Sequence, residues 1–371
     1  MNILITGSEG FVGKNLQFFF KEKKFSYYLF NKKNKIKDLK ILLNKSDTII
    51  HLVGQNKGSK KGIFYKNNLE ITQTLVKNLP KNKEKYIIYA SSIKSSEKNV
   101  YGITKKKTEE YLLKNRHIYN YQLSILKLPN LFGKWCKPNY NSVIATFCNN
   151  IANGKKIILN NGKKKIKFLY IDDLIEQIFC LIKNKKKTLF PVIKKTYIKN
   201  ICYIAKKLKS FKEQNSLLNL NIFSNSFDKK LYSTFLTYLP TAEYSKQLKS
   251  STDKRGYFCE LIKSNKYGQF SFFTIKKKEN RGGHYHSSKV ERFFPVSGDG
   301  YIRFRSILNN KKIDIKFSEK KFIMIETIPG WSHQIFNTGT KECIFICWAN
   351  ENFNSKKPDT HNYPDTHNYK V

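Results

Sequence analysis

The chain has 371 residues, and because a domain usually holds roughly 100–200 residues, two or three domains are expected. Hydrophobic residues make up 40% of the sequence and aromatic residues 14%, which excludes a disordered chain. No apolar stretch approaches the ~18 residues of a membrane-spanning helix, and the N-terminus, MNILITGSEG, lacks the pattern of a signal peptide. The seven cysteines form no disulfide or metal pattern. We therefore expect a cytoplasmic protein without membrane insertion.

The net charge of +43 comes from 70 basic and 27 acidic residues. Such a surplus is typical of proteins that bind nucleic acids. Here, however, most basic residues are lysines, and Asn, Ile, Phe and Tyr, which also have AT-rich codons, are abundant too. We interpret the charge as genome composition and predict no nucleic-acid partner. An anionic small-molecule substrate is compatible with it.

From Met1 to about Ile198, short apolar runs alternate with longer segments that have helical spacing of apolar residues. The runs predicted as strands are MNILITG, YYLF, TIIHLVG, YIIYASS and LSILKLP. Alternating strands and helices predict an α/β Rossmann-type, doubly wound parallel sheet. Residues 197–239 are predicted to add two or three helices, and residues 241–256 to form a linker.

The second part of the chain has short strand-like runs with no convincing helix between them: GYFCELI, GQFSFFTI, RFFPVSG, GYIRFR, KFIMIETI and CIFICWA. This pattern predicts an all-β sandwich or barrel. We therefore predict two domains, residues 1–245 and residues 246–371. The tail repeats the sequence PDTHNY at Pro358–Tyr363 and Pro364–Tyr369, which we interpret as an in-frame repeat in a frayed terminus rather than a second metal site.

A glycine pattern lies between the first predicted strand and the first predicted helix. Gly7, Gly10 and Gly13 occur in ITGSEGFVG. The first glycine allows a tight turn, the second allows close approach of a pyrophosphate, and the third allows close packing of helix and strand. The positive end of the helix then faces the phosphates. The pattern predicts a dinucleotide site.

The end of the second predicted strand bears on the choice of dinucleotide. An acidic residue there binds the ribose of NAD, whereas a cation accommodates the extra phosphate of NADP. Here Asn31, Lys32 and Lys33 follow the strand, and no acid is present. The sequence therefore favours NADPH.

Tyr101 and Lys105 are four residues apart in YGITK, which places both side chains on one helical face. A lysine ammonium lowers the pKa of a nearby phenol, and the phenol then exchanges a proton with a carbonyl during hydride transfer. Ser92, at the end of YIIYASS, is expected to hydrogen-bond the same carbonyl. These three residues are candidate catalytic groups.

The glycine loop, the serine pair, YxxxK and PNLFG (Pro129–Gly133) together resemble the extended short-chain dehydrogenase/reductase family of nucleotide-sugar enzymes. The resemblance implies that Ser92, Tyr101 and Lys105 are catalytic, with Ser91 open as the alternative serine because the interval before Tyr101 is short. It also implies that the cofactor contacts Gly7, Gly10, Phe11, Val12, Gly13, Asn31, Lys32, Leu52, Val53, Gly54 and Lys105.

A second set of residues has metal-ligand chemistry. His284 and His286 are two apart, so on a strand they project to one side, and Glu291 and His333 follow. Their spacing resembles both halves of the cupin signature, GxHxH(x)4E(x)6G and PGxxHxxxN. Nitrogen and oxygen donors of this kind suit Zn, Fe, Mn or Ni. The alternative is a set of ordinary polar strand residues. We predict a site for one of these metals in an all-β cupin (jelly-roll) barrel, serving either proton abstraction next to a ketone or oxygenation.

The reductase-plus-cupin order is similar, over nearly the whole chain, to the CapF family of bifunctional capsular polysaccharide synthesis enzymes. The similarity is carried by Leu128–Cys148, Leu231–Pro240 and Gly282–Phe294. It implies a homodimer that acts on a UDP-linked 2-acetamido-2,6-dideoxy-4-ketohexose. The cupin domain would epimerise C-3, and the reductase domain would then reduce C-4 with NADPH. The product would be UDP-2-acetamido-2,6-dideoxy-L-talose, in the UDP-N-acetyl-L-fucosamine pathway.

In the segment Leu128–Cys148 we expect Asn130, Lys134, Lys137 and Asn141 to contact the substrate, since basic side chains suit a diphosphate. The alternative is a packing segment around Phe132 and Trp135. Two other functions remain open at this point. One is action on another 4-keto nucleotide sugar, such as a dTDP-linked one. The other is a non-catalytic NADP-binding sensor with a sugar-binding cupin.

Overall fold

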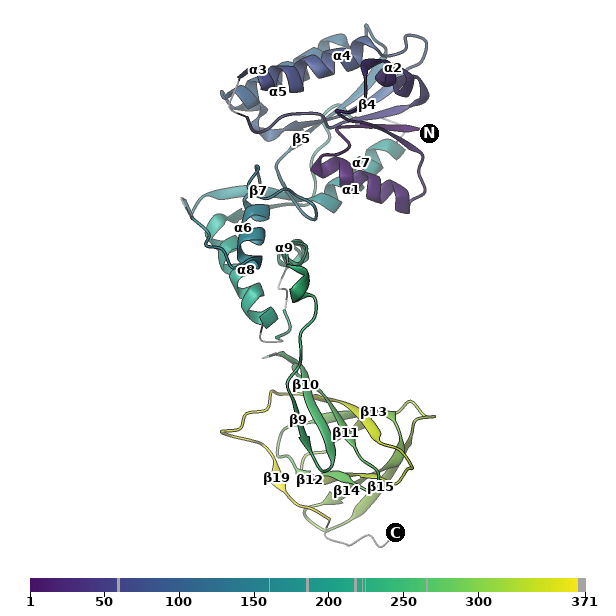
Figure 1. Ribbon diagram of the computed structural model, residues 1–371, viewed down its shortest axis with the longest axis vertical. Coiled ribbons are helices and arrows are strands. Elements are labelled where there is room, and N and C mark those ends of the chain that lie inside the picture. Colours follow the sequence, from purple (N-terminus) through teal and green to yellow (C-terminus); the bar gives the residue numbers. More distant parts are fainter. Residues whose placement is uncertain are drawn as a thin grey trace. The chain divides into compact units, whose positions relative to one another are not determined.

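The computed structural model describes residues 1–58, 61–159, 161–184, 187–216, 219–221, 223, 225–264 and 266–365 (Figure 1). The chain divides into two compact units, residues 1–212 with 223–241, and residues 213–222 with 242–371. Within the described residues, no helix is both long enough and apolar enough to cross a membrane.

The first unit contains a five-stranded parallel sheet in the order β2-β1-β3-β4-β5. Its strands are β1 (Ile3–Thr6), β2 (Tyr27–Phe30), β3 (Thr48–His51), β4 (Lys85–Ser92) and β5 (Tyr121–Leu128). The predicted strands are therefore confirmed. Because the strands are parallel, their carboxyl ends meet at one edge, where ligands bind in folds of this kind.

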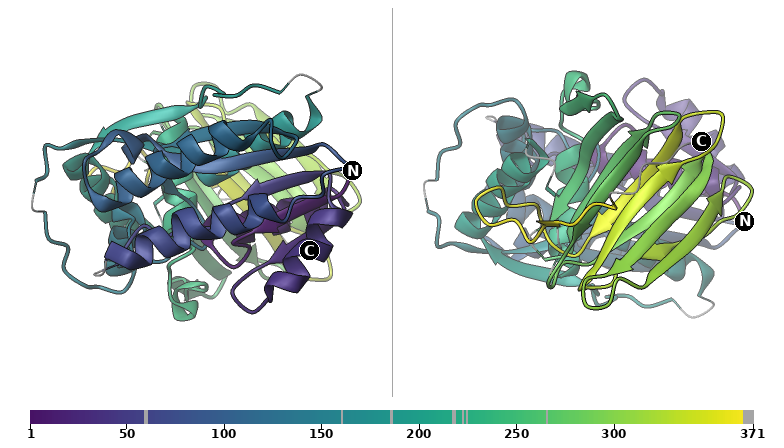
Figure 2. Two further views of the ribbon diagram at one scale, coloured as in Figure 1. Left: turned by 90° about the horizontal axis from the view of Figure 1, so that it is seen from above. Right: turned by 90° about the horizontal axis from the view of Figure 1, so that it is seen from below.

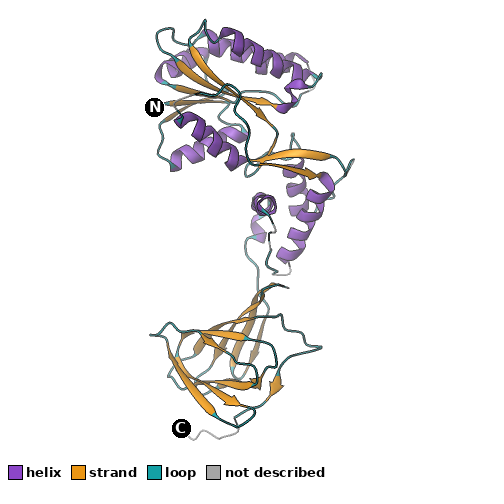
Figure 3. Ribbon diagram, turned by 180° about the vertical axis from the view of Figure 1, so that it is seen from behind, coloured by secondary structure: helices purple, strands orange, loops and turns teal. Residues whose placement is uncertain are grey.

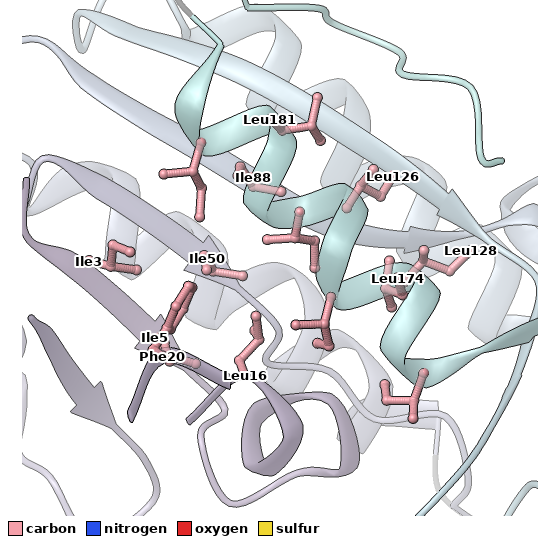
Figure 4. Packing of buried hydrophobic residues seen from close by; sticks show 14 of the residues in the cluster. Ile3, Ile5, Leu16, Phe20, Ile50, Ile88, Leu126, Leu128, Leu174 and Leu181 are labelled. Carbon is pink, nitrogen blue, oxygen red and sulfur yellow. The ribbon is translucent and has the colours of Figure 1, made fainter. Parts of the chain in front are cut away.

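Helices cover both faces of this sheet (Figure 2, left). On one face, α1 (Phe11–Glu22) and α7 (Ile171–Lys183) pack on alternate strand residues such as Ile3 and Ile5, with Leu16, Phe20 and Leu174 between them (Figure 4). Leu4 projects to the opposite face, where it packs with residues of α2 (Ile36–Lys45), α4 (Ile71–Lys77) and α5 (Val100–Asn115). This arrangement is the doubly wound sheet expected from the alternation of strands and helices.

Shorter elements complete the first unit. Three helical turns join the strands: α3 (Lys61–Phe64), the π-helical turn η1 (Tyr65–Glu70) and the 3-10 turn η2 (Ile93–Ser96). A second, three-stranded sheet consists of β6 (Asn130–Phe132), β7 (Lys165–Tyr170) and β8 (Thr196–Asn200). It shares a core with α6 (Val143–Ala152), α8 (Ile201–Ser216) and α9 (Ser226–Leu236). The last two are the helices expected within residues 197–239.

The second unit has two antiparallel sheets (Figure 2, right). The first sheet has the order β16-β13-β18-β11-β10-β9, and the second has the order β15-β14-β17-β12-β19. The first six, in chain order, are β9 (Ser250–Asp253), β10 (Gly256–Ser264), β11 (Gly268–Ile275), β12 (Asn280–Tyr285), β13 (Glu291–Ser297) and β14 (Asp299–Ser306). The other five are β15 (Lys312–Ser318), β16 (Ile325–Glu326), β17 (Trp331–Asn337), β18 (Cys343–Ala349) and β19 (His361–Asn362).

Residues of both sheets share one core, for example Phe273 and Phe345 from the first and Ile302 and Ile335 from the second. The described residues after the 3-10 turn η3 (Thr241–Glu243) contain strands and loops but no helix (Figure 3). The all-β character expected for this part of the chain is therefore confirmed.

Two local expectations were wrong. KFIMIETI forms only the two-residue strand β16, because Phe322 is fully exposed and the ladder with β13 pairs only Ile325 and Glu326. The segment 213–222 belongs with the second unit rather than the first, since the backbone N–H of Leu220 donates to the carbonyl of Lys263 on β10, at 2.8 Å.

Candidate functional site

The glycine turn lies between β1 and α1. Gly7 has a φ of 69°, which favours glycine, and its N–H donates to the Phe30 carbonyl at the end of β2. Gly10 is the N-cap of α1 and carries no side chain over the helix end. A Cβ at Gly13 would lie 2.5 Å from the Ser8 carbonyl oxygen, so only glycine lets the helix pack this closely. Gly7 and Gly13 thus have the turn and packing roles expected from the sequence, while the pyrophosphate contact of Gly10 stays a prediction.

This turn lines a cavity of about 460 Å³ in the first unit. Of the predicted cofactor residues, those that line it are Gly7, Gly10, Phe11, Val12, Gly13, Leu52, Gly54 and Lys105. Val53, Asn31 and Lys32 do not line it. The backbone nitrogen of Val53 packs against Gly7, 3.0 Å from the place of a Cβ on that glycine. Asn31 and Lys32 follow β2 in an exposed turn, in which the Asn31 side chain accepts from the Lys33 N–H at 2.9 Å.

The three candidate catalytic residues lie together in this cavity. Ser92 ends β4, while Tyr101 and Lys105 lie one turn apart on α5. The hydroxyl of Ser92 interacts with the Tyr101 phenol, and the Lys105 ammonium donates to the Ala90 carbonyl at 2.9 Å. Ser91, the alternative serine, donates instead to the buried carboxylate of Glu109. The geometry therefore favours Ser92.

Burial controls the protonation of this group. It raises the pKa of the Tyr101 phenol, and the hydrogen bond with Ser92 offsets only part of that rise. It also lowers the pKa of Lys105 to about 8. The expected lowering of the phenol's pKa by lysine is thus wrong for this structure, because desolvation disfavours both charged forms. Tyr101 is held as a protonated donor.

Two residues that the sequence analysis missed hold this arrangement. A Cβ at Gly102 would lie 2.3 Å from the Glu97 carbonyl oxygen, so the short loop after Ser92 packs directly on the start of α5. Asn68, buried on η1, accepts from the Gln55 N–H at 2.8 Å and donates to Thr104 at 3.1 Å, which ties the loop after β3 to α5. A glycine directly after the tyrosine was the available signal for Gly102. Asn68 had none.

The predicted substrate residues separate into two groups. Asn130, Lys137 and Asn141 line the same cavity as Tyr101. Lys134 does not line it, because its ammonium forms an ion pair with Asp172 at 2.5 Å. Of the alternative packing residues, Phe132 is fully buried in the core, whereas Trp135 is 48% exposed and lines the cavity.

In the second unit the four predicted metal ligands form one cluster. His284, His286, Glu291 and His333 each offer a ligand atom, and these atoms all lie within 4.8 Å of one another. His284 on β12 pairs in register with His333 on β17, after a bulge at Gly283, and Glu291 begins β13. The bulge and the positive φ of Gly282 and Gly283 direct the histidines into the interior.

The protonation of the cluster suits a cation. Burial lowers the pKa of His284 to about 3 and also lowers that of His333. Burial would raise the pKa of Glu291, but its contacts with His286, His333 and Lys289 bring it well below the ordinary value. Neutral imidazoles beside an ionised carboxylate are the states that bind a metal. The residues therefore fit a divalent ion.

The hydrogen bonding of the cluster also fits a bound cation. The Nε2 atom of His286 and both ring nitrogens of His333 are buried and lack a hydrogen-bond partner among the described residues. Glu291 Oε2 approaches the two Nε2 atoms, at 3.3 Å and 3.4 Å, without the alignment of a hydrogen bond. Buried nitrogens without partners are costly, and a bound cation would satisfy them.

A cavity of about 470 Å³ opens onto this cluster. His284, Glu291 and His333 line it together with the cations Arg255, Arg281 and Lys289 and the aromatic residues Phe258, Phe273, Phe293 and Phe353. Asp253 forms ion pairs with Arg255 at 2.6 Å and with Arg281 at 3.3 Å. The carboxylates of Glu260 and Glu351 also line it, so charged groups of both signs face the space above the candidate ligand cluster.

The structure of the C-terminal tail contradicts the interpretation of the first PDTHNY copy as part of a frayed terminus. The first PDTHNY copy is not a frayed terminus, because His361 and Asn362 form β19 and pair with β12. His361 itself lies outside the ligand cluster and stacks on Tyr285. His367, in the second copy, lies outside the described residues.

Comparison with protein families matches residues 3–192 to the NAD dependent epimerase/dehydratase family and residues 251–361 to the polysaccharide biosynthesis C-terminal domain. A curated relative from Pseudomonas aeruginosa, UDP-2-acetamido-2,6-beta-L-arabino-hexul-4-ose reductase, is 35% identical over 364 residues. The match covers 97% of this chain and 98% of the relative.

Solved structures also match nearly the whole chain. The capsular polysaccharide assembling protein CapF from Staphylococcus aureus is 34% identical, with a TM-score of 0.89 over 98% of this chain and 100% of that one. CapF with the inhibitor 3-isopropenyl-tropolone has a TM-score of 0.84, with the same identity and coverage.

Proposed function

Since the chain belongs to the NAD dependent epimerase/dehydratase family and is a homologue of UDP-2-acetamido-2,6-beta-L-arabino-hexul-4-ose reductase, we propose that it is a bifunctional UDP-sugar enzyme of capsule or O-antigen synthesis. Its second unit epimerises C-3 of a UDP-2-acetamido-2,6-dideoxy-4-ketohexose, and its first unit reduces the C-4 ketone. The product is UDP-2-acetamido-2,6-dideoxy-L-talose, in the UDP-N-acetyl-L-fucosamine pathway.

The observation that carries the reductase assignment is the meeting of Ser92, Tyr101 and Lys105 with the glycine turn in one cavity. Bound NADPH would supply the hydride to C-4. The Tyr101 phenol, kept protonated by burial, donates its proton to the ketone oxygen, and Ser92 hydrogen-bonds the same oxygen. The ketone becomes an alcohol, with one hydride and one proton added.

NADPH is favoured over NADH by the residues that follow β2. Neither Asn31 nor Lys32 is acidic, and Lys32 is exposed, where its ammonium would meet a 2′-phosphate. Asn130, Lys137 and Asn141 line the cavity and are proposed to bind the UDP-sugar. Lys134 is left out of this set because of its ion pair with Asp172.

For the epimerase we propose that His284, His286, Glu291 and His333 hold zinc or another divalent ion in a cupin barrel. A divalent ion beside the C-4 ketone would polarise its carbonyl and acidify the C-3 proton. Arg255 and Arg281 line the cavity above the cluster, and although each pairs with Asp253, a guanidinium has five N–H donors, so their remaining N–H groups would bind the diphosphate. The C-3 proton is acidic only while the ketone exists, so epimerisation precedes reduction.

The inhibitor in one CapF structure is compatible with this site. A tropolone carries a hydroxyl and a carbonyl oxygen on adjacent carbons, and paired oxygens of this kind are ligands for divalent ions. We use this chemistry as a probe for the present chain: 3-isopropenyl-tropolone should bind the zinc-loaded protein and should not bind the metal-stripped protein.

The proposal is tested by incubating the protein with the UDP-linked 4-keto sugar in D₂O. With NADPH we expect loss of absorbance at the nicotinamide band and, by NMR, a single reduced product. Without NADPH we expect deuterium at C-3 and no reduction. NADPH binding without turnover would indicate that the protein is a non-catalytic sensor. A preference for a dTDP-linked ketone would exclude specificity for UDP-linked substrates. Mass measurement in solution tests the proposed homodimer.

A further inference from the structure

The C-terminal repeat contacts the loop that carries the metal ligands. The backbone carbonyl of Asp359 accepts from Nδ1 of His286 at 2.5 Å, and His286 is almost completely buried. An imidazole that donates through Nδ1 presents the lone pair of Nε2 on its other side. That Nε2 atom is the one that lies in the cluster with Glu291 and has no hydrogen-bond partner among the described residues.

The side chain of Asp359 holds the loop between His286 and Glu291. Its carboxylate accepts from the backbone N–H groups of Ser287, Ser288 and Lys289, at 2.8, 2.7 and 2.8 Å, and from the Ser288 hydroxyl at 3.0 Å. The side chain is 18% exposed, so these bonds are partly shielded from water. One residue therefore binds both His286 and the loop that leads to Glu291.

The rest of the first copy reaches the strands of the other two histidines. The N–H of Tyr363 donates to the Gly283 carbonyl at 2.8 Å, next to His284. The Tyr363 carbonyl accepts from the Ser332 hydroxyl at 2.7 Å, next to His333. Since β19 also pairs with β12, the segment 358–363 contacts residues within two positions of each of the four candidate ligands.

We propose that the segment 358–363 is the outer shell of the metal site, with Asp359 as the positioning residue that sets the His286 tautomer and the loop to Glu291. The proposal rests on the proposed metal centre. Outer-shell partners of metal-bound histidines fix ring orientation, and their loss typically weakens metal binding ~10–100-fold.

The duplication provides a matched control within the chain. Asp365 occupies the same position in the second copy as Asp359 in the first, but its carboxylate pairs with Arg303 and Lys312, both at 2.9 Å. It makes none of the contacts with the loop 287–289. Asp359→Ala and Asp365→Ala thus remove the same side chain from the same motif, and only the first should affect the metal.

The test is the dissociation constant for Zn²⁺, measured on metal-stripped full-length protein by competition with a chromophoric chelator. We expect Asp359→Ala to raise the constant ~10–100-fold and Asp365→Ala to leave it close to that of the unaltered protein. Asp359→Ala should also be made in a chain lacking residues 364–369, so that the second copy cannot replace the first.

The outcomes separate the two proposals. If the full-length protein binds no zinc, the metal centre itself is wrong. If it binds zinc and Asp359→Ala binds equally well, the role of the Asp359 carboxylate in holding the loop 287–289 is overturned. Asp359→Ala keeps the backbone carbonyl that accepts from His286, so the tautomer is tested separately, by selective ¹⁵N-histidine labelling of the unaltered, metal-free protein. This measurement also serves if Asp359→Ala misfolds. Protonated Nδ1 on His286 supports the proposal, and protonated Nε2 overturns it.

Discussion

At the scale of single residues, the first candidate site depends on a phenol that burial keeps protonated. The sequence analysis expected Lys105 to lower the pKa of Tyr101, yet desolvation dominates and raises it. This direction suits reduction of a ketone, because the donor must carry its proton when the hydride arrives. The interaction that offsets part of the rise comes from Ser92, at the end of β4.

Replacing Tyr101 with Phe should lower kcat for NADPH oxidation by ~10²–10⁴, because the proton donor is lost. The dissociation constant for NADPH should change little, since the ring remains. Tyr111→Phe is the matched control, as Tyr111 lies on the same helix but outside the cavity. Stopped-flow absorbance and fluorescence titration measure the two quantities, and a parallel loss of NADPH binding would contradict the assignment.

The pH dependence of kcat/KM should follow the protonation of Lys105. Burial lowers its pKa to about 8, so its positive charge is present below that pH and is lost above it. Tyr101, with a raised pKa, stays protonated over the same range. We therefore expect kcat/KM for the ketone to fall as the pH rises through about 8. A profile that stays flat to well above this pH would show that the charge on Lys105 is not needed.

At the scale of elements, the glycine turn and the bulge in β12 both place functional atoms by backbone geometry. Gly13 lets α1 approach β1, and Gly282 and Gly283 shift the register so that His284 faces His333. At Gly13 and at Gly282 a Cβ would lie 2.5 Å from a backbone carbonyl oxygen, which cannot move aside as a flexible side chain can.

Gly13→Ala should destabilise the first unit by ~1–3 kcal/mol, the usual cost of overpacking. Its Cβ would lie 2.5 Å from the Ser8 carbonyl oxygen, so α1 must shift and NADPH should bind more weakly. Gly62→Ala is the control, because a Cβ at Gly62 meets nothing within 4 Å. Urea denaturation measures the stability, and equal stability of the two variants would contradict the close packing.

At the scale of the whole molecule, each unit has its own hydrophobic core and its own candidate ligand. A ligand that binds only the folded state stabilises the unit that contains its site, by about 2.7 kcal/mol at a concentration 100 times its dissociation constant. The two units should therefore respond to different ligands.

Calorimetry of the metal-stripped full-length chain should show two unfolding transitions. Zn²⁺ should raise the midpoint of one, and NADPH should raise the midpoint of the other, because the candidate sites lie in different units. The double variant His284→Ala, His333→Ala should abolish the zinc response while the NADPH response remains. If either ligand moved both transitions equally, the units would unfold together.

Much of this organisation was predictable from local patterns. The strands β1 to β5 are apolar runs separated by helical spacing, and the order strand, glycine turn, helix has one common solution in parallel sheets. The cluster of His284, His286, Glu291 and His333 was predictable because the spacing of these residues matches a known signature. The spacing of apolar residues in a strand or helix, and the spacing of residues in a motif, are properties of short segments, so they can be recognised in the sequence.

The remaining features depend on contacts between residues far apart in the chain. Lys134 is withdrawn from the cavity by Asp172, the pKa of Tyr101 is set by the packing around it, and Asp359 reaches the loop 287–289 from the tail. None of these partners is near in sequence, and a lysine or a tail carries no local mark of its partner. Periodicity predicts which face of a segment is buried, but only the folded chain decides what lies against that face.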